Sequence, residues 1–157
     1  MTKILFVCLG NICRSPTAEG VFLYLLQQQN IAEDFFVDSA GTSGFHVGES
    51  ADSRSRNTAK QFGFDLLSKS RQITVADLEN FDYIVAMDRS NYKNIIELSD
   101  VEEHHNKVHL FRDFDSESPT NSDVPDPYYG GHQGFQNVFN ICFAASRGLL
   151  NRIIQNT

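Results

Sequence analysis

Short apolar runs alternate with amphipathic stretches along this chain. Residues 4–7 are continuously apolar and a glycine-containing turn follows them, which predicts a buried strand over residues 3–8. A helix is expected next, with Ser15 at its N-cap, Pro16 at its first position and spaced apolar residues as far as Leu26. The chain thus begins with a strand, a glycine turn and a helix.

The same alternation continues to residue 154. Further strands are expected over residues 35–38, 83–87 and 108–111, and further helices over 52–62, 74–80, 91–98 and 135–154. Residues 113–131 are rich in Asp, Ser, Pro and Gly, which indicates a long loop. Because strands alternate with helices, we expect an α/β fold, and 157 residues suit one domain over 1–157. The predicted architecture is a four-stranded parallel sheet with helices on both faces.

The net charge and the lengths of the apolar runs limit which binding partners and which cellular location are expected. The formal net charge is -7 at pH 7, which argues against nucleic acid or an anionic membrane surface as the main partner. The apolar runs are too short to span a bilayer, and the first residues lack the pattern of a signal peptide, so a cytoplasmic location is expected. Three cysteines, an odd number, do not indicate a disulfide framework. The oligomeric state stays open.

The glycine turn carries the first chemical signal. Cys8 and Arg14 form a Cys-x5-Arg pattern between the expected strand and helix. A loop in this place can turn successive backbone N–H groups inward, and the helix adds the positive end of its dipole. Gly10 and Asn11 tolerate the left-handed backbone that such a loop requires, and the planar guanidinium of Arg14 can bind two phosphate oxygens. The pattern therefore predicts a phosphate-binding loop after the first strand.

The same loop offers a nucleophile. The field that attracts phosphate also favours the thiolate of Cys8, and the Ser15 hydroxyl is placed to donate a hydrogen bond to that sulfur. A cysteine that ends a buried strand is more often a small core residue, and Cys-x5-Arg alone also arises by chance. A non-catalytic phosphate-binding module would need the loop alone, without a nucleophile or an acid.

Hydrolysis of a phosphate ester also needs an acid, because the departing oxygen must receive a proton. The candidate is Asp126, which stands between two prolines and is followed by Tyr128 and Tyr129. The prolines restrict the backbone and the tyrosines offer an aromatic wall. An Asp-Pro pair is also a common turn, and the local sequence alone slightly favours that interpretation.

Four blocks of sequence carry a resemblance to a known family. They read VCLGNICRSP at residues 7–16, DSAG at 38–41, FDYI with AMD at 81–88, and DPYYG at 126–130. In these blocks, and in the distances between them, the chain resembles the low-molecular-weight protein tyrosine phosphatases over nearly its whole length.

The resemblance implies hydrolysis of phosphotyrosine and small aryl phosphates through a cysteinyl-phosphate intermediate. Tyrosine-phosphorylated proteins would be the partners, inorganic phosphate the product, and no metal or other cofactor would be needed. Cys8 would be the nucleophile, Arg14 would bind phosphate, and Asp126 would act as acid and then as base. Asn11, Ser15 and Ser39 would hold the loop in shape. The implied substrate and phosphate-binding residues are Leu9, Gly10, Asn11, Ile12, Cys13, Arg14, Ser15, Phe45, Tyr128 and Tyr129.

Three positions have open interpretations. Ser68 stands three residues before Arg71, where family members carry a supporting histidine, which leaves the support of the loop in question. Cys13 suits a reversible disulfide with Cys8, as the resemblance suggests, and equally a small buried side chain. Phe45 is expected to stack on a substrate ring, with ordinary loop packing as the alternative.

Two further groups are expected to be structural. Cys142 lies between apolar residues of the last helix and is assigned to the core. A set of histidines beside two glutamates has poor spacing for a metal, and a solvated acidic loop is the expected interpretation. This set is Glu102, Glu103, His104, His105 and His109.

Other activities on similar scaffolds are less consistent with the residues. An arsenate reductase would need a downstream cysteine pair, and Cys142 stands alone in the terminal region. Phosphatases for phosphoarginine carry threonine in place of Ile12, whose branched side chain should crowd the planar guanidine, so phosphotyrosine is favoured. Dinucleotide binding is disfavoured because the first turn lacks Gly-x-Gly-x-x-Gly.

Overall fold

The computed structural model describes residues 1–128 and 131–157, and it contains the expected parallel sheet. The strands are β1 (Thr2–Cys8), β2 (Phe35–Gly41), β3 (Tyr83–Ala86) and β4 (Val108–Leu110). Their spatial order is β2-β1-β3-β4, and every adjacent pair is parallel. The four-stranded parallel sheet predicted from the sequence is confirmed.

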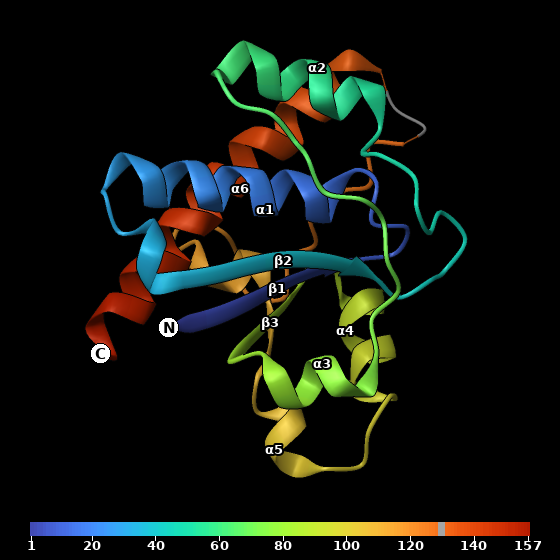
Figure 1. Ribbon diagram of the computed structural model, residues 1–157, viewed down its shortest axis with the longest axis vertical. Coiled ribbons are helices and arrows are strands. Elements are labelled where there is room, and N and C mark those ends of the chain that lie inside the picture. Colours follow the sequence, from blue (N-terminus) through green and yellow to red (C-terminus); the bar gives the residue numbers. More distant parts are fainter. Residues whose placement is uncertain (129–130) are drawn as a thin grey trace.

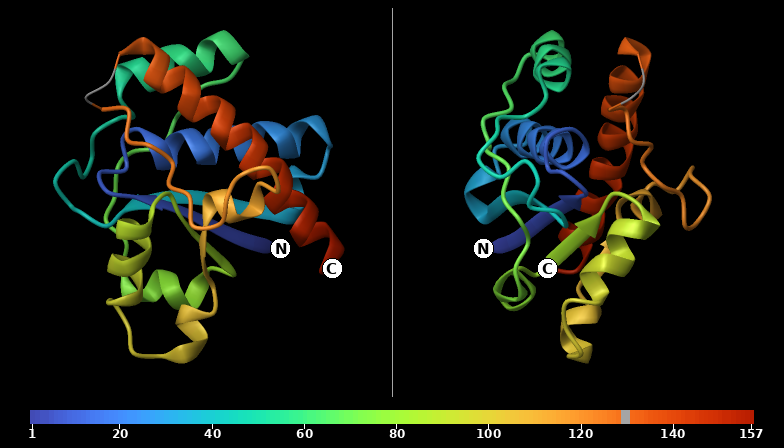
Figure 2. Two further views of the ribbon diagram at one scale, coloured as in Figure 1. Left: turned by 180° about the vertical axis from the view of Figure 1, so that it is seen from behind. Right: turned by 90° about the vertical axis from the view of Figure 1, so that its right-hand side faces the viewer.

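Helices cover both faces of this sheet, as predicted (Figure 1). One face carries α1 (Arg14–Gln28), α2 (Ser53–Phe62) and the long α6 (His132–Gln155). The other face carries α3 (Val75–Asn80), α4 (Arg89–Ile96) and α5 (Glu102–His105). Figure 2 shows the two layers from behind and from the side. No helix among the described residues is both long enough and apolar enough to cross a membrane.

The apolar run of β1 is buried because each face of the strand meets its own core. Ile4 and Phe6 belong to the cluster under α1 and α6, whereas Leu5 and Val7 belong to the cluster under α3 and α4. Alternate residues of a strand point to opposite faces, so a strand covered on both faces reads as continuously apolar. Burial of all four side chains fixes β1 as the centre of the fold.

The element boundaries differ from the sequence expectation in a few places. Helix α1 begins at Arg14 with Cys13 at the N-cap, so the assignment of Ser15 as N-cap was wrong. Strand β2 continues to Gly41, three residues beyond its predicted end. Helix α5 and two short 3-10 segments (Ala32–Asp34 and Phe111–Phe114) were not predicted, because three or four residues are too few to show a helical period.

The order of the strands determines where a ligand can bind. The chain leaves β1 toward β2 on one side, and β3 returns to pair with β1 on the other side. In such sheets the carboxyl end of the strand at the reversal opens into a crevice. That position is occupied by the loop that follows Cys8, and both chain ends lie toward the opposite end of the sheet (Figure 1).

Candidate active site

A cavity of about 270 Å³ opens at the carboxyl end of β1. Its lining brings together most of the predicted site residues and adds His46. The lining residues are Cys8, Leu9, Gly10, Ile12, Cys13, Arg14, Phe45, His46, Asp126 and Tyr128. Residues from three distant parts of the sequence therefore meet at the predicted phosphate-binding loop.

The sulfur of Cys8 is buried at the start of the loop and receives hydrogen bonds from it. Its Sγ lies 3.1 Å from the Ser15 hydroxyl oxygen and accepts a 3.2 Å bond from the backbone N–H of Asn11. The Ser15 hydroxyl oxygen accepts a 2.7 Å hydrogen bond from the side-chain amide of Asn11. The hydroxyl proton of Ser15 can therefore point toward the sulfur. Donors directed at sulfur stabilise a thiolate.

The loop needs its two small residues for different reasons. Asn11 has φ of 56°, so the predicted left-handed conformation is present there. Gly10 is not in the left-handed region, contrary to the sequence expectation. A Cβ at Gly10 would lie 3.1 Å from Cδ2 of His46, so this glycine instead permits the close approach of the segment carrying His46.

Asn11 is the centre of the network that holds the loop. Its side chain donates to Ser15 at 2.7 Å and to Ser39 at 3.0 Å, and its Oδ1 accepts the backbone N–H of Arg71 at 3.0 Å. Ser39 in turn donates to Glu19 at 2.6 Å. Asn11 therefore ties the loop to β2 and to the segment before α3.

Glu19 closes this network on α1, and Ser68 contributes to it. Burial raises the pKa of the Glu19 carboxyl, while hydrogen bonds from Ser39 and Ser68 act in the opposite direction. Nearby Asp38 raises the pKa further and Arg71 lowers it. The residue in the place of the family's histidine is thus a hydroxyl donor directed at Glu19.

Arg14 is buried, and hydrogen bonds to two groups outside the loop fix the orientation of its side chain. Its Nη1 donates to Asp88 at 2.6 Å and to the carbonyl of Val124 at 3.0 Å. Burial acts to lower the pKa of Arg14, but the charges of Cys8, Asp88 and Asp126 outweigh it and the pKa is raised. The guanidinium stays charged in the buried site, where it can attract an anion.

Asp126 stands at the mouth of the cavity. Its side chain is 46 % exposed, and its Oδ2 lies 3.8 Å from Nη2 of Arg14, too far for a hydrogen bond. Its Oδ1 accepts the backbone N–H of Tyr128 at 3.0 Å, which is the turn that the Asp-Pro pair suggested. The residue forms a turn and also lines the cavity, so the two interpretations of the sequence are compatible.

Aromatic side chains form the rim. Phe45 is 84 % exposed and meets the ring of His46 edge-on, with centroids 5.0 Å apart. Tyr128 also lines the cavity, and the guanidinium of Arg54 lies over its ring, 5.4 Å from the centroid. Tyr129, also predicted at the rim, lies outside the described residues.

The other two cysteines are buried. Burial, with the charge of Asp52 as a smaller cause, raises the pKa of Cys13 to about 12. Cys142 lies in the core, as expected, and burial raises its pKa well above the usual range. Both thiols are therefore protonated at neutral pH. The described residues contain no disulfide.

The histidine segment is not the solvated loop that was expected. Residues 102–105 form α5, and His104 is buried between the Ser99 hydroxyl at 2.7 Å and the Glu79 carboxylate at 2.6 Å. No group of three or more potential metal ligands occurs among the described residues. His104 therefore ties α5 to α3 and to the turn after α4.

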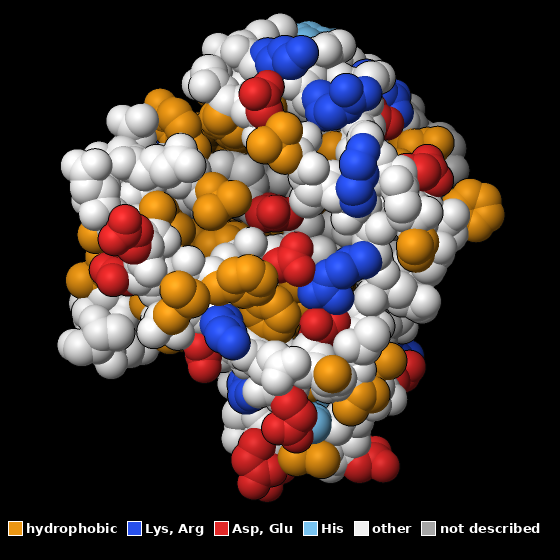
Figure 3. Space-filling view, in the orientation of Figure 1, with side chains coloured by type: hydrophobic (Ala, Val, Ile, Leu, Met, Phe, Trp, Pro, Cys, Tyr) orange, Lys and Arg blue, Asp and Glu red, His pale blue; other side chains and the backbone are white. Residues whose placement is uncertain are grey.

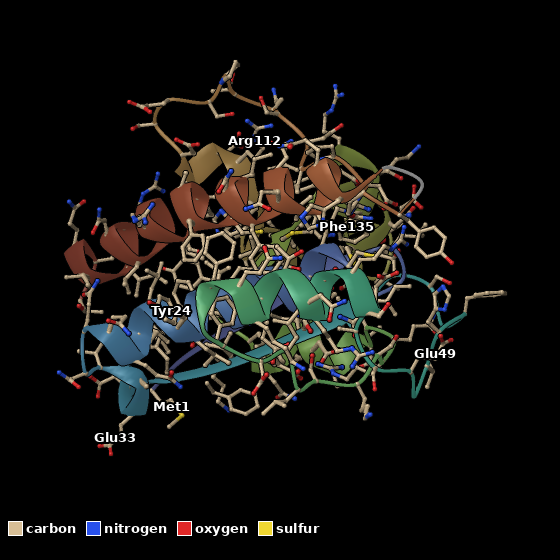
Figure 4. All side chains as sticks on the ribbon, turned by 90° about the horizontal axis from the view of Figure 1, so that it is seen from above. Met1, Tyr24, Glu33, Glu49, Arg112 and Phe135 are labelled. Carbon is tan, nitrogen blue, oxygen red and sulfur yellow. The ribbon has the colours of Figure 1, made fainter. Side chains whose placement is uncertain are left out.

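Sequence reasoning missed the roles of Asp88 and His46. Asp88 is the second residue after the end of β3, and the carboxyl ends of adjacent parallel strands meet at one edge, so its position was a usable signal. His46 had no such signal, because its place depends on the path of the loop after β2. Phe135, at the start of α6 (Figure 4), also packs against Ile12 and Cys13.

Comparisons with known proteins agree with this geometry. Residues 3–157 match the family model described as low molecular weight phosphotyrosine protein phosphatase. The human protein of that name is 41% identical over 151 residues, 96% of this chain and 94% of the human one.

Solved structures agree as well. A protein tyrosine phosphatase from Entamoeba histolytica superposes with a TM-score of 0.94 at 42% identity, covering 99% of both chains. A Drosophila arginine phosphatase superposes with a TM-score of 0.89 at 31% identity, covering 97% of this chain and 98% of its own.

Proposed function

This chain belongs to the low molecular weight phosphotyrosine protein phosphatase family, and from this we propose that it is a phosphoric monoester hydrolase acting on phosphotyrosine in proteins and on small aryl phosphates. The reaction would proceed through a cysteinyl-phosphate intermediate on Cys8. The observation that carries the proposal is the meeting of the Cys8 thiol, the Arg14 guanidinium and the Asp126 carboxyl group in one cavity. Residues 1–157 would act as one catalytic domain.

The phosphate is bound by the loop between β1 and α1. Nη1 of Arg14 is already occupied by Asp88 and Val124, which fixes the guanidinium plane and leaves Nη2 for a phosphate oxygen. Backbone N–H groups of the loop and the start of α1 add partial positive charge. Together they supply the charge neutralisation that phosphoryl transfer requires.

In the first step the Cys8 thiolate attacks phosphorus. An S–P bond forms as the bond between phosphorus and the ester oxygen breaks, and protonated Asp126 gives its proton to the departing phenolate. Asp126 lines the same cavity as the buried sulfur and is much more exposed, which supports this role. Cys8 and Asp126 then lie on opposite sides of the phosphorus, as in-line displacement requires.

In the second step a water molecule replaces the phenol. The Asp126 carboxylate accepts a proton from this water. The water oxygen attacks phosphorus, and the S–P bond breaks. Inorganic phosphate leaves and the thiolate returns. Ser15, 3.1 Å from Sγ, stabilises the sulfur as it departs.

A second candidate substrate is phosphoarginine, because the Drosophila arginine phosphatase is similar over nearly its whole length. Ile12 lines the cavity and is 8% exposed. Its branched side chain narrows the space available to a planar guanidine, and a flat aromatic ring can lie between Phe45 and Tyr128 instead. Phosphotyrosine is therefore the favoured substrate.

The test combines turnover with capture of the intermediate. The protein should hydrolyse para-nitrophenyl phosphate in the presence of a metal chelator, and acid quenching during turnover should leave a phosphoryl group on the peptide containing Cys8. A phosphotyrosine peptide should be turned over faster than the same peptide carrying phosphoarginine. Phosphoryl transfer to another residue, or no turnover, would overturn the mechanism, and the reverse preference would overturn the substrate.

A further inference from the structure

A second cavity, of about 260 Å³, lies between α1 and the segment that follows α2. One face of α1 forms the first wall and residues 64–68 form the second. Figure 3 shows the surface hollowed over α1, with an acidic side chain at the floor and apolar side chains around it. Nothing in the proposed reaction uses this hollow.

The walls are held together by close contact at one point. A Cβ on Gly20 would lie 2.4 Å from Cδ2 of Leu66, so the second wall rests directly on the helix there. Leu66 is buried, whereas Asp65 beside it is exposed. The cavity is therefore a fixed space between two anchored elements.

Two carboxylates line this space and form no direct ion pair with a described cationic side chain. Glu19 is partly buried on the helical wall and Asp65 lies on the other wall. Over residues 1–128 and 131–157, neither forms an ion pair with a lysine, arginine or histidine. Burial raises the pKa of Glu19, while hydrogen bonds from Ser39 and Ser68 and the charge of Arg71 act in the opposite direction.

Aromatic rings lie next to these carboxylates. Tyr24 on α1 stacks on Phe64, with centroids 5.1 Å apart and planes at 29°, and both line the cavity. Tyr24 is labelled in Figure 4, on α1 beside α2. Aromatic faces attract cations, and a neighbouring carboxylate adds an ion pair, so this combination suits a positive charge on an apolar body.

We propose that the cavity binds a small organic cation, with its ammonium or guanidinium group at Glu19 and its apolar body against Tyr24 and Phe64. Both rings line the cavity and give the ligand an apolar wall, and the exposed Asp65 adds negative charge beside it. An inorganic cation would leave this aromatic surface unused. The ligand class is therefore an amine or guanidine that carries an aromatic or aliphatic group.

The site is connected to the phosphate loop by hydrogen bonds already described. Glu19 accepts from Ser39, Ser39 accepts from Asn11, and Asn11 donates to Ser15 beside the Cys8 sulfur. A bound cation favours the charged form of Glu19, which is the stronger acceptor. The cation should therefore order the loop and raise kcat/KM for phosphate ester hydrolysis, an effect that rests on the proposed function.

The binding test compares a cation with a neutral molecule of nearly the same shape. Benzylammonium chloride and benzyl alcohol are titrated into the whole protein by calorimetry at neutral pH, with inorganic phosphate present to occupy the first cavity. Benzylammonium should bind at least about tenfold more tightly than benzyl alcohol, since a hydrogen bond to a charged group is stronger than one between neutral groups. Equal affinities, or no binding of benzylammonium, would overturn the proposal.

Variants locate the binding. Glu19→Gln keeps an acceptor for Ser39 but removes the charge, and should weaken benzylammonium about tenfold or more. Glu33→Gln makes the same change at an exposed carboxylate outside the cavity and should leave the affinity unchanged. Tyr24→Leu should weaken binding by a few fold. If Glu19→Gln binds as well as the parent protein, the site lies elsewhere and the proposal fails.

Activity gives a separate result. Benzylammonium should raise kcat/KM for para-nitrophenyl phosphate in the parent protein and in Glu33→Gln, and should leave it unchanged in Glu19→Gln. Calorimetric binding with no change in kcat/KM would overturn the coupling alone. A protein that never turns over the substrate would overturn the proposed function, while the titration would still decide whether the cavity binds the cation.

Discussion

Replacing Asn11 by alanine should destabilise the protein and disorder the phosphate loop. The substitution removes three side-chain hydrogen bonds, at 2.7, 3.0 and 3.0 Å. At a net value of about 0.5–1.5 kcal/mol each, they contribute about 1.5–4.5 kcal/mol. The backbone adds a further cost, because φ is 56° and alanine in the left-handed region is disfavoured by about 1–2 kcal/mol.

The chain offers a control that separates these two contributions. Asn30 also has φ of 56°, is exposed, and has no side-chain hydrogen bond to any described residue. Asn30→Ala should therefore show only the backbone cost. Urea unfolding of both variants, followed by circular dichroism, gives two free-energy losses whose difference is the value of the three hydrogen bonds.

We expect Asn11→Ala to lose at least about 1.5 kcal/mol more than Asn30→Ala. It should also lose turnover, whereas Asn30→Ala should keep it. Equal losses of stability in the two variants would refute the reasoning, since the network around Asn11 would then contribute nothing beyond its backbone conformation.

Four further predictions concern the site and the core. Cys8→Ser should bind phosphate in a calorimetric titration yet lose turnover, because a hydroxyl is a far weaker nucleophile, while residual turnover near the parent rate would exclude Cys8. Asp126→Asn should slow phenyl phosphate on the order of a hundredfold or more, but affect esters of acidic phenols much less, because their leaving groups depart unaided; an equal loss on both would remove Asp126 as the acid. Gly148→Ala should destabilise the protein by at least about 1–3 kcal/mol in urea unfolding, since its Cβ would clash with the backbone carbonyl oxygen of Phe114, and unchanged stability would contradict that contact. Burial raises the pKa of the Glu19 carboxyl above its value in the unfolded chain, so the free energy of unfolding should fall as pH rises from about 4.3 through the native pKa. Glu19→Gln should remove that part of the pH dependence. The same dependence of unfolding free energy on pH in the variant and the parent protein would contradict the shift.

Much of the fold was predictable because its signals are local. The continuous apolar run of β1 marked a strand covered on both faces, and the Cys-x5-Arg spacing together with Asn11 marked the loop after it. Asp52 and Thr74 stand at the N-caps of α2 and α3, and both residue types favour that position. Each of these features is encoded within a few residues.

The parts that were missed depend on contacts between distant segments. Gly10 reads as a left-handed residue from its type alone, but it is small because the His46 side chain approaches it. Ser15 is a different case, because its position beside the Cys8 sulfur was predicted and only its assignment as N-cap was wrong. His104 lies between Ser99 and Glu79 because α5 packs beside α3. The approach of His46 to Gly10 and the pairing of Glu79 with His104 cannot be read from neighbouring sequence.

The hydrogen bonds around the phosphate loop also bear on the order in which the protein gains activity as it folds. Partners of Asn11 and Arg14 are separated from them by 28, 60, 74 and 110 positions along the chain. Contacts of such long range form late, since the entropy of closing large loops must first be overcome. A growing or partly folded chain can therefore contain β1 and α1 and still lack an ordered site. The Arg14 guanidinium is held in place only when the segment near residue 124 has arrived, so the proposed site is incomplete until nearly all of the chain is in place.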